Sequence, residues 1–281
     1  MRRGRVKARR IGLALGGGAA RGWAHLGVLS LLDEIGVTPS VICGTSIGAV
    51  VGALKASGRL QAALDEIMGA DLIRVLSYVS PGIREGALID SRRIHNLLRA
   101  WFGHADIGDL QAPFAAVATD IATGDSVVLR SGDLVSALMA SIAIPAIFPP
   151  RFTRGRWLSD GGLSDPVPVG AARALGADAV IAVGLNSRTA GIGSGDGDGT
   201  DGGNGGSAGR KPSLNAVLLS TLMIAERNLA ASRLSLDRPE VLIEPDMSGF
   251  VGSEFHRARE LSAIGYESAR AASDALLALG G

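Results

Sequence analysis

The sequence is poor in several residue types that would point to particular classes of protein. It has one cysteine, Cys43, so no disulfide can form within the chain, which fits a reducing compartment such as the cytoplasm. Aromatic residues make up 4% of the 281 residues and the formal net charge is +1. The chain therefore offers neither aromatic residues for base stacking nor a strong positive charge, and it does not suggest a nucleic-acid partner. No apolar run reaches the roughly 18–20 residues that a membrane span needs. Cys43 itself, next to Gly44, is interpreted as a small buried residue at a strand end.

The N-terminus has two interpretations. Residues 1–10 are basic and residues 11–20 are small and apolar, as in a short secretory signal. Three consecutive glycines would break the helical core of such a signal, however. We therefore expect residues 1–10 to be a disordered basic lead, followed by a strand and a glycine turn. The lead leaves open a weak attraction to anionic lipid headgroups, and with it peripheral contact with a membrane.

Apolar residues are plentiful, at 47% of the chain, and they occur in segments that alternate between strand and helix patterns. Such alternation predicts a mainly parallel sheet with helices on both faces, in one domain over residues 11–281. Strands are expected at 11–15, 40–44, 156–160, 177–185 and 240–245, with a hairpin over 114–130. Helices are expected at 21–36, 46–57, 59–68, 91–102, 133–141, 166–176, 213–236 and 253–278, and an irregular loop at 77–86.

Residues 186–212 differ from their surroundings because they are rich in Gly and Asp. A calcium-binding repeat is one hypothesis for this segment, since Asp recurs at short spacing. It lacks the terminal Glu of an EF-hand, so no metal site is assigned. With almost nothing to bury, the segment is interpreted as a flexible surface insertion.

A glycine-rich stretch, Gly16 to Gly22, lies between the first strand and the first helix. Glycines allow close approach of the backbone to a ligand, and free amides at a helix start can hold an anion. The anion could be a dinucleotide phosphate or the oxyanion of an acyl-transfer intermediate. The third glycine of a dinucleotide fingerprint is replaced by Arg21, which disfavours the first hypothesis.

The stretch Gly44-Thr45-Ser46-Ile47-Gly48 has the pattern G-x-S-x-G at a predicted strand-to-helix junction. This context is that of a nucleophile elbow, in which small neighbours leave room for a sharp turn. A helix cap made by Ser46 or Thr45 is the alternative, and the two are compatible locally.

A nucleophilic serine needs a base, and the chain has four histidines. An α/β-hydrolase order would assign His256, but only one strand and one helix precede Ser46, which does not fit that fold. His25 follows the glycine stretch, and His95 and His104 flank an unmarked helix. No histidine lies in a motif, whereas Asp160 begins the stretch "DGGLSDPVPV". The base is therefore expected to be a carboxylate, although Asp-Gly-Gly is also a common turn.

Four motifs in this order, "GGGAARGWAHLGVL", "GTSIG", "ASIAIPAIFPP" and "LSDGGLSDPVPV", resemble the patatin-like phospholipase family. The likeness runs from about Ile11 to Gly184, and it is closest to compact bacterial members related to the neuropathy-target-esterase branch. It implies a patatin fold, a three-layer α/β/α sandwich with a mainly parallel central sheet. The implied activity is hydrolysis of lipid or small acyl esters by a phospholipase, lysophospholipase or carboxylesterase that needs no cofactor.

The resemblance also implies roles for individual residues. Ser46 would be the nucleophile and Asp160 its base. The residues whose amides would form the oxyanion hole are Gly16, Gly17, Gly18 and Ala19. Supporting positions in the motifs are Arg21, Gly44, Gly48, Gly161 and Gly162. Relatives often carry Asn at the position of Asp165, whose charge is expected to raise the pKa of the dyad if both carboxyls are buried.

Other hypotheses remain at this stage. A patatin-fold binding or regulatory protein with little turnover is the main alternative, and a nucleotide-binding oxidoreductase is a third. The segment Ser141 to Phe152 could lodge an acyl chain or be a buried connection. Residues 75–83 could form a rim or lid. The sequence does not indicate an oligomeric state.

Overall fold

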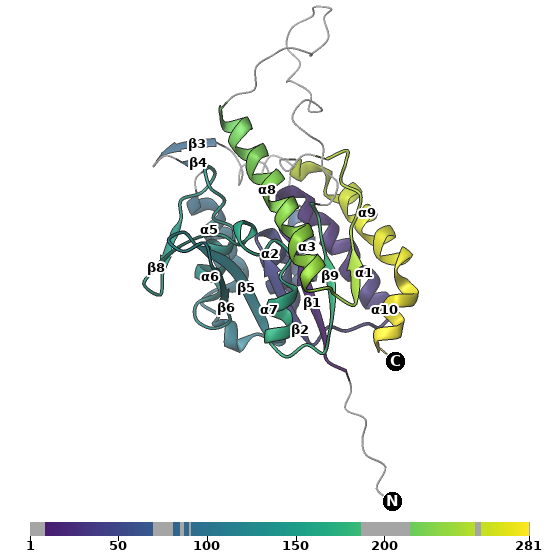
Figure 1. The fold of residues 1–281 in the computed structure, drawn as a ribbon. Helices are drawn as coiled ribbons and strands as arrows, with labels where there is room; N and C mark the ends of the chain where they lie inside the picture. The colour runs from purple at the N-terminus through teal and green to yellow at the C-terminus, as the bar shows by residue number, and fades with distance from the viewer. Residues whose placement is uncertain are drawn as a thin grey trace, which may run out of the picture.

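A computed structural model describes residues 9–69, 81–84, 87–89, 91–186, 214–250 and 254–280. Its centre is an eight-stranded sheet in the order β10-β9-β1-β2-β5-β8-β7, with β6 paired to β5 (Figure 1). The strands are β1 (Ile11–Leu15), β2 (Val41–Thr45), β5 (Phe114–Asp120), β6 (Ser126–Leu129), β7 (Arg151–Thr153), β8 (Arg156–Asp160), β9 (Ala179–Val183) and β10 (Val241–Ile243). A separate ribbon pairs β3 (Pro81–Arg84) with β4 (Ala87–Ile89).

Strand directions divide the sheet into two parts. The strands from β10 to β5 run parallel to one another, whereas β6, β7 and β8 join by antiparallel pairing. The parallel strands β1, β2 and β9 are buried along their whole length, because helices cover both faces. The fold is therefore mixed α/β with a mostly parallel centre, as predicted.

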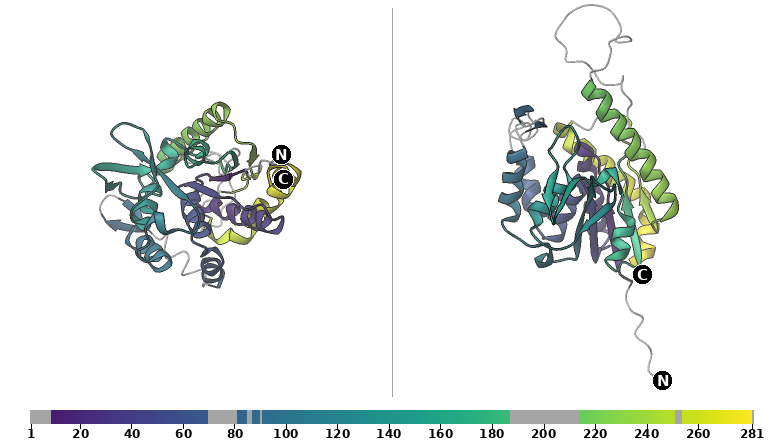
Figure 2. Two further views of the ribbon diagram at one scale, coloured as in Figure 1. Left: turned by 90° about the horizontal axis from the view of Figure 1, so that it is seen from below. Right: turned by 60° about the vertical axis from the view of Figure 1, so that its left-hand side comes forward.

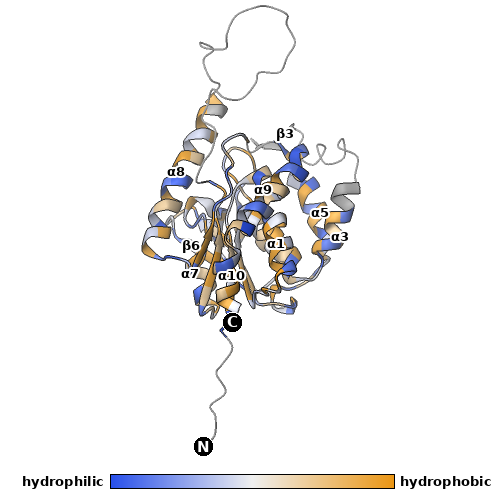
Figure 3. Cartoon of the chain, turned by 90° about the vertical axis from the view of Figure 1, so that its right-hand side faces the viewer, coloured by the Kyte–Doolittle hydropathy of each residue, from blue (hydrophilic) through white to orange (hydrophobic). Residues whose placement is uncertain are grey.

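Helices form the two outer layers (Figure 2). They are α1 (Ala24–Glu34), α2 (Ile47–Ala56), α3 (Leu60–Gly69), α5 (Ser91–Phe102), α6 (Leu134–Ser141), α7 (Val169–Ala174), α8 (Leu214–Leu236), α9 (Ala258–Ala271) and α10 (Ser273–Gly280). Short 3-10 helices are η1 (Ala19–Trp23), η2 (Ile107–Asp109), η3 (Gly161–Leu163) and η4 (Phe255–Arg257). The central strands are coloured as hydrophobic in Figure 3 and lie between α8 and α1.

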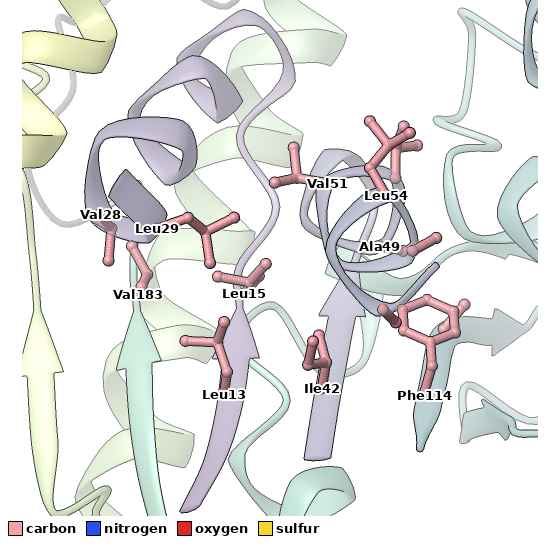
Figure 4. Close-up of a cluster of buried hydrophobic side chains, with 14 of the residues drawn as sticks. Leu13, Leu15, Val28, Leu29, Ile42, Ala49, Val51, Leu54, Phe114 and Val183 are labelled. Atoms are coloured by element: carbon pink, nitrogen blue, oxygen red, sulfur yellow. The ribbon is translucent and has the colours of Figure 1, made fainter. Parts of the chain in front are cut away.

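Alternate side chains along the strands point to opposite faces of the sheet and belong to two separate hydrophobic cores. Leu13 and Leu15 of β1 and Ile42 of β2 point toward α1 and α2, where they meet Leu29 and Val51 (Figure 4). The intervening residues face α7 and α8. This second core includes Ala14, Val41, Cys43, Val180 and Ala172, and Ala230 of α8 completes it. Cys43 is fully buried, as predicted, but it lies in the middle of β2 rather than at a strand end, and it packs in this second core.

Several predicted boundaries need correction. The helix expected from Pro166 begins only at Val169, because Pro168 precludes a helical conformation for the residue before it. The single helix expected over 253–278 is divided into η4, α9 and α10. Ser273 Oγ donates to the carbonyl of Arg270 at the second break, a local bond that competes with helix continuation. β7 was not expected from the sequence.

Some predictions fall wholly or partly outside the described residues. They are the basic lead, most of the insertion at 186–212, and all but residues 81–84 of the expected loop at 77–86. Within the part of the chain that the structure describes, no helix combines the length and apolar character that a membrane crossing requires.

Candidate active site

Ser46 lies at the junction between β2 and α2, at the carboxyl edge of the sheet. Its φ of 55° is positive, which is unusual for a residue with a side chain and is typical of a nucleophile elbow. The flanking glycines permit this turn. A Cβ on Gly44 would lie 2.3 Å from the carbonyl oxygen of Gly48, and one on Gly48 would lie 2.2 Å from that of Leu15. The first turn of α2 can therefore pack directly on the ends of β1 and β2.

Asp160 meets Ser46 because β5 aligns the strands that carry them. Thr45 pairs with Val117 of β5, and Asp160 pairs with the next residue, Ala118. The end of β2 and the end of β8 therefore pair with consecutive residues of β5, which lies between the two strands. Ser46 Oγ donates a hydrogen bond of 2.6 Å to Asp160 Oδ2, and both side chains are buried.

Further hydrogen bonds hold the two residues in place. The backbone amide of Ser46 donates to Ser141 Oγ at 2.9 Å, and the hydroxyl of Ser141 donates to the carbonyl of Val117 at 2.6 Å. The second oxygen of Asp160, Oδ1, accepts from the amide of Gly162 at 2.8 Å. Asp160 thus has one carboxyl oxygen fixed by the backbone and the other directed at Ser46.

The glycine loop lies beside Ser46, since a Cβ on Gly17 would contact the Ser46 Cβ at 3.4 Å. Two of its amides are already used: those of Gly16 and Gly17 donate to the carbonyls of Val183 and Pro166 at 2.9 and 3.0 Å. Each backbone amide carries a single hydrogen, so these two amides are less available to a substrate oxygen, and their place in an oxyanion hole stays a prediction. The amides of Gly18 and Ala19 have no acceptor among the described residues.

Arg21 is buried behind this loop. Its Nε donates to the carbonyl of Gly18 at 3.2 Å, and its Nη1 has no acceptor within the described part of the chain. Burial lowers the pKa of Arg21 to about 10, against a raising effect of Glu226, so the guanidinium stays charged at neutral pH. A positive charge consequently adjoins the two unused amides.

His25 supports the loop rather than Ser46. Its Nε2 lies 2.8 Å from the carbonyl oxygen of Gly16, an atom that can only accept, so the proton resides on Nε2. Burial lowers the pKa of His25 to about 4, and the ring is neutral at physiological pH. His25 therefore anchors the glycine loop, and the Ser46 hydroxyl bonds to a carboxylate.

The pKa of Asp160 is raised to about 6, and its main cause is burial. The hydrogen bonds from Ser46 and Gly162 act in the opposite direction. The expectation that Asp165 would be responsible is wrong in its cause: Asp165 is buried, but its charge interacts with Arg233 and Asp237. The carboxyl that does interact with Asp160 belongs to Glu226 of α8.

The Glu226 side chain reaches the site because Gly162 has no side chain to block it. A Cβ on Gly162 would lie 2.6 Å from Glu226 Oε1 and 3.1 Å from Asp160 Oδ1, so the two carboxyls adjoin. Burial and then the charge of Asp160 raise the pKa of Glu226 to about 8, while Arg21 lowers it. Glu226 is thus mainly protonated at neutral pH, which leaves Asp160 as the negative charge beside Ser46.

A model of patatin-like phospholipases matches residues 13–173, which include Ser46, Asp160 and the glycine loop. The chain belongs to the patatin-like phospholipase family. The resemblance predicted from its four motifs is thereby confirmed.

Relatives in this family share part of the chain. An uncharacterised NTE family protein of Mycobacterium tuberculosis is 40% identical over 182 residues, which are 65% of this chain and 51% of that protein. Mouse patatin-like phospholipase domain-containing protein 6 is 35% identical over 189 residues, 63% of this chain and 14% of that protein. This chain therefore matches about half, or less, of the length of these relatives.

The fold also matches a solved structure. VipD from Legionella pneumophila superposes with a TM-score of 0.55 and 15% sequence identity, over 96% of this chain and 67% of that one. At this identity the match concerns the fold alone. It agrees with the patatin fold that the motifs predict.

Two polar residues of the site were missed by sequence reasoning, Ser141 and Glu226. Ser141 is the second residue of the motif "ASIAIPAIFPP", which the sequence already marked, but its bond to the Ser46 amide depends on tertiary packing. Glu226 lies on a long helix without a motif, and no sequence signal places it next to Gly162. His95 and His256, by contrast, form no hydrogen bond with Ser46 or Asp160 in the part of the chain that the structure describes.

Proposed function

We propose that this protein is a serine acyl-ester hydrolase of the patatin type, acting on lipid or small carboxylic esters through Ser46 and Asp160. The single observation that carries the proposal is the 2.6 Å hydrogen bond from Ser46 Oγ to Asp160 Oδ2 at a strained strand-to-helix turn. A carboxylate at this distance can accept the hydroxyl proton as the serine attacks.

In the first half-reaction, Ser46 Oγ bonds to the ester carbonyl carbon and its proton passes to Asp160 Oδ2. The carbonyl oxygen becomes an oxyanion, and the free amides of Gly18 and Ala19 are the donors proposed to bind it. Collapse of this intermediate breaks the ester bond, and the leaving alkoxide takes the proton from Asp160. The product is an acyl-enzyme and a free alcohol.

In the second half-reaction, Asp160 accepts a proton from water as the water oxygen attacks the acyl carbon. The carboxylic acid leaves when Ser46 Oγ regains that proton. Aspartate is a weaker base than histidine, so charge stabilisation must supply more of the rate. The buried guanidinium of Arg21, bonded to the carbonyl of Gly18, supports the glycine loop in this role.

The proposed lodging for the acyl chain begins directly beside Asp160. The carbonyl of Ala143 accepts from the amide of Asp160 at 3.0 Å and from Ser159 Oγ at 2.7 Å. The partly buried side chains of Ile144, Ile147 and Phe148 follow in the chain. An apolar segment fixed to the base by hydrogen bonds suits a substrate with a hydrocarbon chain.

Labelling with a fluorophosphonate tests the nucleophile, because this reagent bonds covalently to an activated serine. We expect labelling of the wild type and none of Ser46→Ala. A binding protein with the same fold but no activated serine, the main alternative, would give no labelling of either.

Hydrolysis of p-nitrophenyl esters of increasing chain length and of lysophospholipids then defines the substrate. We expect turnover of acyl esters by the wild type. Failure of every ester, in a protein that does label with the fluorophosphonate, would restrict the proposal to a different acyl substrate. Failure of both assays would refute it.

A further inference from the structure

A row of exposed apolar side chains crosses β7, β8 and the residue that follows β5, at the carboxyl edge of the sheet. Phe152 of β7 pairs with Trp157 of β8, so both side chains lie on the same face, with ring centroids 5.2 Å apart. One step beyond the pairing of Asp120 with Leu158, the amide of Ile121 donates to the carbonyl of Trp157. Ile121 therefore continues the row on that face.

These three side chains are unusually exposed for their size. Phe152 is 62% exposed, and Trp157 and Ile121 are each 52% exposed. Single exposed apolar residues are ordinary, but a contiguous row that includes two aromatic rings marks an interaction surface. The chain as a whole has few aromatic residues, 11 in all, and two of them stand together here.

The opposite face of the same hairpin is basic. Arg156 is paired across the hairpin with Thr153, and Arg154 occupies the turn. Both arginines, with Thr153, line a hollow of about 370 Å³ between the hairpin and β6. Arg156 is 56% exposed and has an ion pair of 3.5 Å with Asp120, and Arg154 donates to the backbone and hydroxyl of Ser131. The turn therefore combines two guanidinium groups with an aromatic pair.

The position of the hairpin relates it to the candidate active site. β8 runs antiparallel to β5, so Arg156 and Trp157, at the start of β8, lie at the carboxyl end of β5. Asp160 follows Trp157 by three residues of extended strand, a distance of about 10 Å. The strand also lies on the side of the molecule remote from α9 and α10 (Figure 1).

We propose that the β7–β8 hairpin, with Phe152, Trp157 and Ile121 as its apolar face and Arg154 and Arg156 as its basic tip, docks onto a lipid bilayer containing anionic headgroups. Tryptophan and phenylalanine suit the boundary between headgroups and acyl chains, where one part of the ring is buried and another faces water. Guanidinium groups pair with headgroup phosphates, and cations near an anionic surface are attracted to it.

The turn of the hairpin lies at the carboxyl end of β5, so docking by this turn brings the carboxyl edge of the sheet, where Ser46 lies, toward the bilayer that would supply the ester. The biological role of this docking rests on the proposed function, hydrolysis of a lipid ester. Binding to vesicles, however, is measured without turnover. A failure of the docking proposal can therefore be told apart from a failure of the proposed hydrolase activity.

Vesicle sedimentation with wild type and a Phe152→Ser/Trp157→Ser variant tests the apolar face. We expect the wild type to sediment with phosphatidylcholine vesicles that contain phosphatidylglycerol. The double variant should lose about tenfold or more of this partition, since it removes two large apolar side chains from the contact with the bilayer. The matched control is Leu236→Ser, because Leu236 is 86% exposed at the far end of α8. It should bind like the wild type.

Lipid composition and fluorescence give independent measurements. Arg156→Gln should reduce the preference for phosphatidylglycerol over pure phosphatidylcholine and leave the residual binding to pure phosphatidylcholine unchanged. The wild-type tryptophan emission should shift to the blue on addition of vesicles, and Trp157→Phe should abolish that shift. Hydrolysis of a water-soluble p-nitrophenyl ester should be the same in all these variants.

Three outcomes would overturn the proposal. The first is a wild type that does not sediment with either vesicle. The second is a double variant that sediments like the wild type while retaining its far-UV circular dichroism. The third is a change in self-association of the double variant in gel filtration without lipid, which would assign the hairpin to a contact between two copies of the chain.

Discussion

Ser46 and Asp160 are separated by 114 positions in the chain, yet their side chains are joined by a hydrogen bond of 2.6 Å. The strand β5 is responsible, because consecutive residues of it, Val117 and Ala118, pair with Thr45 and Asp160. The separation between nucleophile and proposed base is therefore set by sheet register rather than by a flexible loop. A one-residue change in this register would turn the Asp160 side chain to the other face of the sheet.

Replacement of Asp160 by asparagine tests the base. The amide keeps the shape of the carboxyl but cannot accept the Ser46 proton, so we expect kcat to fall about 10²- to 10⁴-fold. The fold should be at least as stable as the wild type at pH 8, because a buried charge has been removed. Asp274→Asn on α10, an exposed position, is the control and should keep full activity. Retained turnover in Asp160→Asn would mean that another group is the base.

The pH dependence of kcat/KM should reflect the raised pKa of Asp160, about 6. Below that pH the carboxyl is protonated and cannot accept a proton, so activity should fall on the acid side and reach a plateau above it. An unperturbed histidine titrates near 6.5, so the profile alone does not identify the group. His256→Gln should leave the acid limb in place. Loss of that limb in His256→Gln would assign it to the histidine instead of Asp160.

Removal of the Ser141 hydroxyl should affect both stability and turnover. Ser141→Ala leaves the amide of Ser46 and the carbonyl of Val117 without their buried partner, which costs about 1–3 kcal/mol for each unsatisfied group. We expect a lower urea midpoint and a reduced kcat, with KM little changed, because the serine loses its backbone anchor. Ser235→Ala, at an exposed position of α8, should change neither. A normal kcat in Ser141→Ala would show that this anchor does not position the nucleophile.

Buried carboxyls should make the protein less stable as the pH rises. The folded-state pKa of Asp165 is raised by burial to about 6 from 3.8, so the folded state binds the proton more tightly than the unfolded state. The stabilisation from this proton is complete below about pH 4 and is lost as the pH passes through about 6. Glu226, with a pKa of about 8, extends the loss to higher pH.

Asp165→Asn isolates one of these groups. At pH 8 its free energy of unfolding should exceed that of the wild type by up to about 3 kcal/mol, and near pH 4 the two should be equal. Subtracting the two denaturation profiles removes the effect of groups that titrate in the opposite sense, such as Asp133, whose pKa is lowered mainly by its bonds to Arg99 and Ser136. A difference that does not vary with pH would contradict the assignment.

The strands and turns on which this site is built can be predicted from local residue patterns. The short apolar runs of β1, β2 and β9, the helix after Ser46 and the hairpin of β5 and β6 all follow from local periodicity and turn residues. The motifs around Ser46 and Asp160 were also evident, because glycines at a strand end are required for a sharp backbone turn. Together they indicated the family that the comparison then showed.

The groups that surround Ser46 and Asp160, in contrast, follow from the packing of segments that are distant in the sequence. The glycine loop was visible as a motif, but the sequence does not reveal that the amides of Gly16 and Gly17 bond to Val183 and Pro166. It likewise assigned the neighbouring charge to Asp165, which is close to Asp160 in the sequence, whereas the carboxyl beside Asp160 comes from Glu226 of the distant helix α8. Hydrogen-bond partners and burial depend on the packing of segments remote in sequence, and local residue patterns carry no record of that packing.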